Sequence, residues 1–201
     1  MTADAPAVRS NQRLRTRNAI VDACRALVLS GADITMPVVA KAALVSEATA
    51  YRYFADLPSL LAEALAGTWP QPADAMKPVA GSTDALYRID FAAGFMLREV
   101  LARQGAVRAM IAASLLRPDI ADTARPGHRF ALIDYALSPL DHAPDVISTA
   151  ALAALKRDLA VIVSAEALFV LTDLCHVSPD EAVTTIARIA RTVTQAAITR
   201  E

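Results

Sequence analysis

Apolar residues recur three and four positions apart along most of this 201-residue chain. That spacing puts side chains on one face of an α-helix, as the series Leu57, Leu60, Leu61 and Ala64 illustrates. No stretch alternates apolar and polar residues in the way that a half-buried β-strand does. The pattern therefore predicts an all-α fold of about nine helices.

Capping residues and helix breakers give approximate bounds for these helices, and the expected N-caps include Thr35, Ser46, Asp56 and Ser178. We expect them over residues 12–30, 36–43, 47–54, 57–68, 83–104, 106–116, 127–137, 146–175 and 178–199. Residues 70–82 contain three prolines and a glycine, which is typical of a linker. The sequence thus predicts an N-terminal head over residues 9–67 and a C-terminal body over residues 82–201.

The composition favours helices and places basic residues unevenly. Hydrophobic residues make up 55% of the chain but aromatic residues only 5%, so the apolar content is mostly alanine, valine and leucine. The net charge is -1, yet residues 8–52 contain seven basic and three acidic residues, which leaves the remainder at -5. A basic head on an acidic body is typical of a protein that contacts DNA at one end.

Several classes of protein find no support in the sequence. The N-terminus lacks the apolar core of a signal peptide, and the longest apolar run, residues 159–171, is too short and too polar to cross a bilayer. Cys175 and His176 lack further ligands at metal-binding spacing. No nucleophile elbow, glycine-rich phosphate loop or metalloprotease motif is present. We expect a cytoplasmic protein without a metal, a cofactor, a membrane partner or an enzymatic activity.

The segment from Thr35 to Leu61 contains two short helical patterns separated by Leu44, Val45 and Ser46. Two helices joined by such a short turn form a helix-turn-helix, whose second helix can enter a DNA major groove. That second helix is rich in hydroxyl groups and carries Arg52, which can reach a phosphate or a guanine edge. The alternative is an ordinary helical hairpin inside an all-α domain.

The run VSEATAYRYF, which follows ITMPVVAKAA and precedes an L-x-x-L-L helix, resembles the DNA-binding domain of the tetracycline-repressor (TetR) family. The resemblance covers about residues 13–66. It implies a homodimer of about nine helices per subunit, whose three-helix heads bind a palindromic operator and whose bodies bind a small-molecule effector. It also implies DNA contacts from Arg13, Arg15, Arg17, Thr35, Lys41, Ser46, Glu47, Ala48, Thr49, Tyr51, Arg52 and Tyr53.

In this resemblance the hydroxyl groups hold phosphates, residues 47, 48 and 52 face the bases or their margins, and the other basic residues supply charge to the backbone. Three residues depart from the family pattern. Leu44 takes a turn position where glycine is usual, and Leu57 takes a position where lysine is common. Glu47 places a carboxylate on a surface that faces phosphates. We expect these departures to weaken DNA binding without changing the class of protein.

The body contains candidates for an effector pocket and a dimer interface. Aromatic, sulfur-containing and acidic side chains are candidate pocket residues, although each has an alternative role in the core or at the surface: Phe91, Phe95, Met96, Met110, Phe130, Tyr135 and Glu166. Small and apolar residues of the last helix step by three and four, as in a heptad: Val183, Ile186, Ala190, Val193 and Ala197. This stripe packs on its own subunit's core or, as the resemblance implies, forms the dimer interface.

Together these patterns predict a ligand-responsive transcriptional regulator. We expect it to act as a repressor that binds a palindromic operator as a homodimer and is released by a small apolar effector. The alternative is a helical small-molecule-binding protein in which operator binding is weak or lost. Alanine substitution of Arg52 and Tyr53 separates the two, because only a regulator would lose DNA affinity while keeping its fold.

Overall fold

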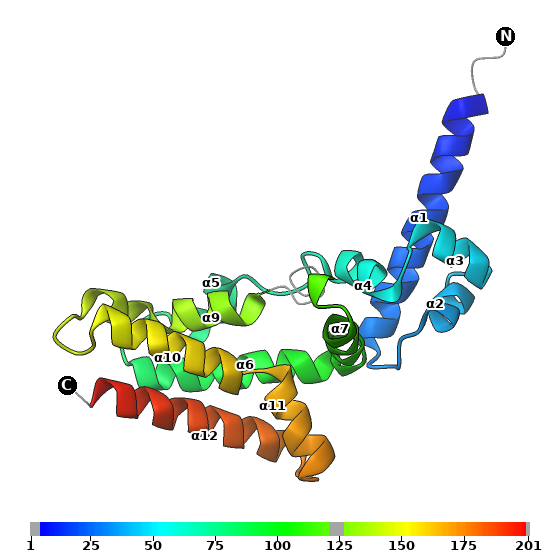
Figure 1. Cartoon of the computed structure of the whole chain (residues 1–201). Helices are drawn as coiled ribbons and strands as arrows, with labels where there is room; N and C mark the ends of the chain where they lie inside the picture. The colour runs from blue at the N-terminus through cyan, green and yellow to red at the C-terminus, as the bar shows by residue number, and fades with distance from the viewer. Residues whose placement is uncertain (1–4, 121–126, 200–201) are drawn as a thin grey trace. The chain divides into compact units, whose positions relative to one another are not determined.

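The computed structural model describes residues 5–120 and 127–199, with side chains from residue 10 onward (Figure 1). Within these ranges the chain forms helices and turns and contains no β-strand, which confirms the all-α class. Eleven α-helices are described, more than the nine expected, because α5 and α11 are single short turns. The helices are α1 (Ala5–Leu29), α2 (Met36–Ala42), α3 (Glu47–Tyr53), α4 (Leu57–Leu65), α5 (Pro72–Ala75), α6 (Ala85–Ala102), α7 (Gln104–Leu116), α9 (His128–Leu137), α10 (Thr149–Ile162), α11 (Ala165–Phe169) and α12 (Pro179–Ile198).

The described residues divide into two compact units. The first contains the chain up to Thr68 together with residues 102–120, and the second contains residues 69–101 and 127–199. Relative to the boundaries that the sequence suggested, α7 belongs with the N-terminal helices, and α5 belongs with the second unit. No helix in the described ranges is long and apolar enough to cross a membrane.

In the first unit α1 packs against α2 and α4, and α4 packs against α7. Ile20, Cys24 and Val28 from α1 are buried together with Leu60 and Leu61 from α4. The start of α7 passes the backbone of Ala32 so closely that a Cβ atom at residue 105 would collide with the Ala32 carbonyl oxygen. Only glycine fits at this position, and its small size allows α7 to pack closely against the head.

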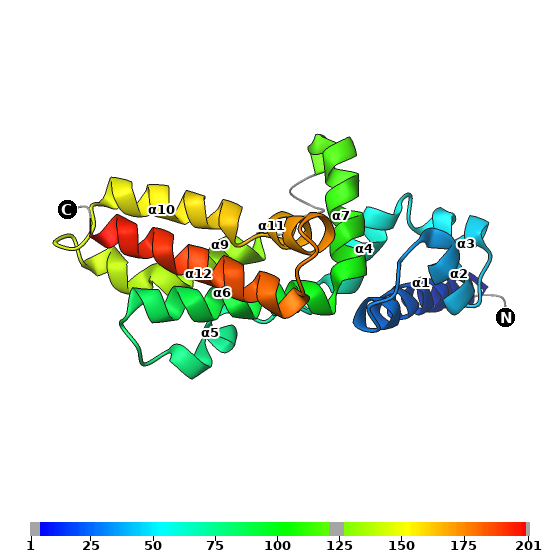
Figure 2. The ribbon, with the colours of Figure 1, turned by 90° about the horizontal axis from the view of Figure 1, so that it is seen from below.

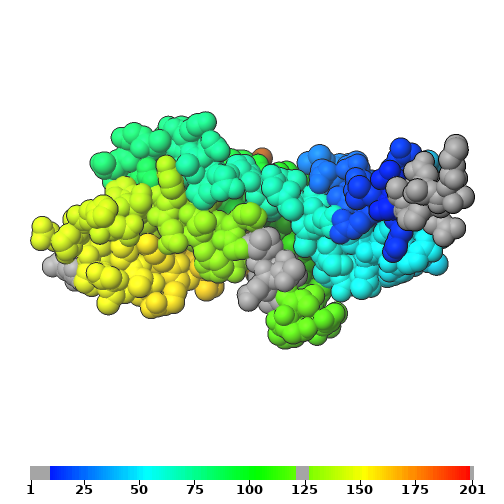
Figure 3. Space-filling view, turned by 90° about the horizontal axis from the view of Figure 1, so that it is seen from above, coloured from blue at the N-terminus to red at the C-terminus, as the bar shows by residue number. Residues whose placement is uncertain are grey.

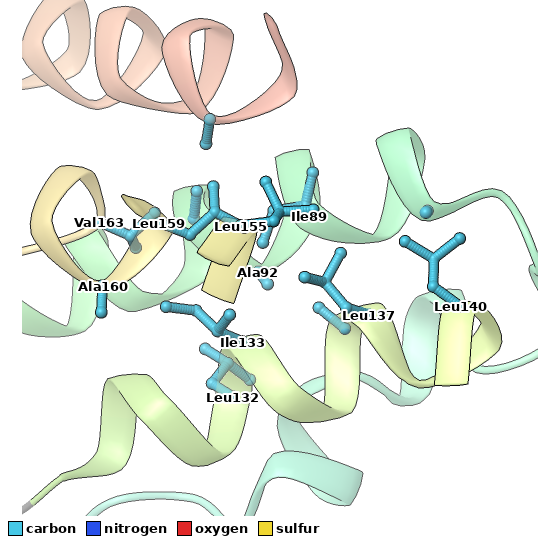
Figure 4. Close-up of a cluster of buried hydrophobic side chains, with 14 of the residues drawn as sticks. Ile89, Ala92, Leu132, Ile133, Leu137, Leu140, Leu155, Leu159, Ala160 and Val163 are labelled. Atoms are coloured by element: carbon cyan, nitrogen blue, oxygen red, sulfur yellow. The ribbon is translucent and has the colours of Figure 1, made fainter. Parts of the chain in front are cut away.

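In the second unit α12 runs beside α10 and α6 (Figure 2). The core is built from apolar side chains of α6, α9 and α10, among which Ile89, Ile133, Leu137, Leu155 and Leu159 are almost fully buried (Figure 4). Alanines fill the remaining contacts with α12, where Ala190 is fully buried. The many small side chains therefore allow neighbouring helix backbones to approach closely.

A buried arginine crosslinks this second unit. The Arg88 side chain is 3% exposed, and its guanidinium donates hydrogen bonds to the carbonyl oxygens of Ala136 at 2.8 Å and Tyr135 at 2.5 Å. It also donates to the carbonyl oxygens of Val79 and Ser82, each at 3.3 Å. The cation is thereby stabilised by carbonyl dipoles from the α6 entry and from the end of α9.

The prediction of a single long helix over residues 146–175 is wrong. The chain breaks after α10 at Val163, and Ser164 then caps α11 by accepting a hydrogen bond from the Ala167 amide at 3.1 Å. Three β-branched residues, Val161, Ile162 and Val163, precede the break and weaken helix propensity there. A wide π-helical turn over Val170–Leu174 follows α11 directly.

Candidate functional site

The helices α2 and α3 are joined by a turn whose hydrogen bonds define both helix ends. Thr35 caps α2 by accepting from the Val38 amide at 3.5 Å. At the other end the Val45 amide donates to the Ala40 carbonyl and the Leu44 amide donates to the Lys41 carbonyl, which is a Schellman motif. Leu44 has φ 57° and is 93% exposed, so a non-glycine residue adopts the left-handed conformation at the turn position where the resemblance implies glycine.

The surface of α3 is dominated by polar and aromatic side chains. Glu47, Ala48, Tyr51 and Arg52 are exposed, and Tyr53 is half-buried. The guanidinium of Arg52 lies 5.7 Å from the centre of the Tyr53 ring, which orients it along the helix surface. Tyr53 packs partly against the core of the first unit, whereas the exposed side chains of α3 project from the head.

A groove of about 540 Å³ lies between α3 and the N-terminal half of α1. The α1 wall consists of Gln12, Arg13 and Thr16, which are three and four residues apart and so share one helix face. The α3 wall consists of Val45, Ser46, Thr49, Arg52 and Tyr53. Five predicted DNA-contact residues, Arg13, Ser46, Thr49, Arg52 and Tyr53, thus come together in one concave site.

The groove combines two cations with several hydroxyl groups. Arg13 and Arg52 line it from opposite helices, and no carboxylate is among its described lining residues. The Ser46 hydroxyl accepts from the Thr49 amide at 3.2 Å and donates to the Thr49 hydroxyl at 2.9 Å. That arrangement leaves the Thr49 hydroxyl hydrogen available to an acceptor in the groove. The site is therefore suited to an oxyanion such as a phosphate.

The structure assigns Arg17 a different environment from the other predicted contacts. Its guanidinium forms a bidentate ion pair with the Glu63 carboxylate of α4. The guanidinium carbon also lies 4.9 Å from the centre of the Phe54 ring. The pair is half-buried and ties α1 to α4. Arg17 therefore stabilises the head, which a local sequence pattern could not indicate because its partner is 46 residues away.

The remaining predicted DNA contacts lie outside the groove. Arg15 is exposed on α1 and Lys41 is exposed on α2, whereas the hydroxyl of Thr35 is engaged in capping. Glu47, Ala48 and Tyr51 are exposed on α3 but do not line the groove. Sequence reasoning missed Gln12 and Thr16, although their shared face with Arg13 was a usable signal.

A second concave region belongs to the second unit. It is a pocket of about 700 Å³ between α9, α10 and the start of the segment that contains α11. Side chains of α9 and α10 lie side by side on the face shown in Figure 3. Two of the predicted effector residues, Phe130 and Glu166, line it.

The other predicted effector residues lie elsewhere. Phe91 and Phe95 stack with their ring centres 6.5 Å apart and line a smaller hollow of about 310 Å³ between α6 and α12. Met96 and Tyr135 pack against the core of the second unit, and Met110 is buried in the first unit. The seven candidates therefore do not form one pocket.

The heptad-like stripe of α12 faces the interior of its own unit. Val183 and Ile186 are each 2% exposed and Ala190 is fully buried, while Val193 and Ala197 are partly buried against the same core. The alternative in which this stripe packs on its own subunit therefore describes the structure. The spacing alone could not separate the two cases, because both require apolar residues every three and four positions.

Comparisons with known proteins do not identify a family for this chain. The chain matches no protein-family model, no curated protein and no solved structure. In the part of the chain that the structure describes, no group of three or more histidine, cysteine, aspartate or glutamate residues is placed to hold a metal ion.

Proposed function

We propose that this protein is a ligand-responsive transcriptional regulator of the tetracycline-repressor type, and that its N-terminal unit binds DNA through a helix-turn-helix formed by α2 and α3. The observation that carries the proposal is the groove between α1 and α3. It places Arg13 and Arg52 around hydroxyl groups of Ser46, Thr49 and Tyr53, and none of its described lining residues is a carboxylate. The resemblance of residues 13–66 to the family supports the same assignment.

The chemistry of the groove matches the sugar-phosphate backbone of DNA. Phosphate oxygens accept hydrogen bonds from hydroxyl groups and form charge-assisted bonds with guanidinium groups. A phosphate held in this groove would leave the exposed face of α3, with Glu47, Ala48 and Tyr51, towards the adjoining major groove. Backbone contacts thus fix the position of the helix, and the exposed face reads the bases.

The proposal includes a homodimer that binds a palindromic operator, because two heads spaced by about one DNA turn recognise the two half-sites. Val183, Ile186 and Ala190 are buried within one chain, so a dimer would use other positions of the second unit. We further propose that a small molecule in the second unit releases the DNA by favouring a different arrangement of the subunits. Repression is the proposed outcome of operator binding.

The proposal is tested by fluorescence anisotropy with DNA fragments taken from the regions that flank the gene. We expect salt-sensitive binding to a palindromic fragment. Replacing Arg13 or Arg52 with alanine should weaken binding and lower the slope of log K against log salt by about one unit each. Arg191→Ala, an exposed site on α12, is the matched control and should leave the slope unchanged.

Absence of salt-sensitive binding to any such fragment would refute the regulator. Circular dichroism of the same variants checks that the fold is retained, since both arginines are exposed. Ligand binding without DNA binding would favour the alternative, a helical small-molecule-binding protein whose operator binding is weak or lost.

A further inference from the structure

The pocket of the second unit is apolar at its base and partly open to solvent. Ile133 and Ala160 contribute buried apolar walls, Ala167 is partly buried beside them, and three larger apolar side chains reach solvent around the pocket. Val161 is 74% exposed, Phe130 is 49% exposed and Val170 is 48% exposed. A concave cluster of exposed apolar side chains with a charged rim is typical of a ligand-binding site.

Ion pairs account for most of the charge in this pocket. The Lys156 ammonium lies 3.3 Å from an Asp134 carboxylate oxygen, which links α10 to α9. The Arg129 guanidinium lies 3.6 Å from a Glu166 carboxylate oxygen, which links α9 to α11. These two pairs hold the walls of the pocket in place.

Arg157 also lines the pocket and takes part in neither of these two ion pairs. Among the described residues, no carboxylate lies within ion-pair distance of its guanidinium. It is exposed on α10, one turn before Val161 and on the same face. The described lining residues include three basic and two acidic side chains, so their charge balance is +1. An apolar cluster beside an available guanidinium is complementary to a molecule with an apolar body and one carboxylate.

The backbone conformation around the pocket is a second, independent indication of a ligand-binding site. The α10 helix ends at Ile162, Ser164 caps a new helix, and the π-helical turn begins at Val170. Ser164 and Val170 both line the pocket. Wide helical turns occur frequently at functional sites because they widen the helix and redirect side chains.

We propose that this pocket binds a small amphipathic carboxylate, with Arg157 holding the carboxylate group and Phe130, Val161 and Val170 covering the apolar body. The inference rests on the proposed function, because it specifies the chemical class of the effector. It specifies the expected small apolar effector as a molecule that also carries a carboxylate. It also gives Glu166, a predicted effector residue, a structural partner in Arg129.

Isothermal titration calorimetry with dodecanoate as the probe, compared with 1-dodecanol and dodecyltrimethylammonium, tests this proposal without DNA. We expect one dodecanoate per chain and binding at least about tenfold tighter than that of either analogue. Arg157→Gln should weaken dodecanoate binding by about tenfold and leave dodecanol binding unchanged. Arg191→Gln is the matched control on an exposed helix face.

A second variant tests the apolar part of the site. Val161→Glu, at an exposed site, places a carboxylate beside Arg157 and should reduce binding of both dodecanoate and dodecanol. Equal binding of dodecanoate and dodecanol, preference for the ammonium compound, or no effect of Arg157→Gln would overturn the proposal. Dodecanoate binding without any DNA binding would overturn the regulator but not the pocket assignment, and the reverse result would overturn only the pocket assignment.

Discussion

The hydroxyl of Ser46 donates a hydrogen bond to the hydroxyl of Thr49 at 2.9 Å, and it accepts one from the Thr49 amide at 3.2 Å. One side chain thus both caps α3 and orients a hydroxyl that lines the α1–α3 groove. The stability of this helix and the chemistry of the groove are therefore coupled through two residues, and substitutions can separate them.

Ser46→Ala should lower the free energy of unfolding by about 1 kcal/mol, because it removes the N-cap of α3. Thr49→Val keeps the backbone amide that Ser46 caps and removes only the hydroxyl, so it should change stability by less than about 0.5 kcal/mol. If the groove binds DNA phosphates, both variants should weaken DNA binding. Chemical denaturation and anisotropy measure the two effects, and a loss of stability in Thr49→Val as large as that in Ser46→Ala would contradict the separation.

Arg17 offers a contrast with Arg13 on the same helix. Arg17→Ala removes the ion pair with Glu63 and the contact with Phe54, which join α1 to α4. Because the pair is half-buried, we expect a loss of about 1–2 kcal/mol in the free energy of unfolding. Arg13→Ala should cost less than about 0.5 kcal/mol, since Arg13 is exposed. Urea denaturation of both variants provides the comparison, and equal losses would show that Arg17 has no special structural role.

The positions where sequence reasoning succeeded are those where the cause is local. The caps at Thr35, Ser46, Asp56 and Ser178 each use a hydroxyl or carboxylate that accepts from an amide three residues later. Such a motif is complete within four residues, so it is visible in the sequence. The turn at Leu44 was also visible, through the family resemblance, which implies a position where glycine is usual.

The positions where it failed depend on distant contacts or on competing patterns. The structural role of Arg17 depends on its ion pair with Glu63. The packing of α7 against the head depends on the close approach of residue 105 to Ala32. The break after α10 lay within an apolar run that also fits a continuous helix, and only the β-branched series before Ser164 indicated otherwise. Because a pocket requires several helices in fixed positions, the grouping of its lining residues was equally inaccessible.

Leu44→Gly should stabilise the first unit by about 0.5–1 kcal/mol. The left-handed conformation costs a non-glycine residue about 1–2 kcal/mol, and part of this gain is offset by the greater freedom of glycine in the unfolded chain. Leu44→Ala is the matched control, because alanine removes the exposed side chain but keeps the backbone cost. The midpoint temperature of thermal unfolding should therefore rise in Leu44→Gly and change little in Leu44→Ala. A similar shift in both variants would mean that the exposed leucine side chain, rather than its backbone, is responsible.

The buried guanidinium of Arg88 should be hard to replace. Arg88→Met keeps an apolar stem of similar length but leaves the carbonyl oxygens of Tyr135 and Ala136 without this donor, so we expect a loss of about 3–5 kcal/mol in the free energy of unfolding. Arg88→Lys retains the charge but cannot donate in several directions of one plane, and it should recover only part of the loss. Arg188→Met, at an exposed site on α12, is the control. Near-native stability of Arg88→Met would show that the carbonyl groups are satisfied in another way.

The two cysteines should differ sharply in reactivity. Burial raises the pKa of the Cys24 thiol to about 11, and the Coulombic effect of Arg25 only partly opposes this. Near pH 8 only about one Cys24 in a thousand is therefore a thiolate, which is the reactive form. Cys175 is exposed, so iodoacetamide should modify it first in the native protein, as read by mass spectrometry. Cys24 should react only after the first unit is unfolded in urea. Equal rates at both positions in native buffer would show that the core around α1 opens far more readily than its packing implies.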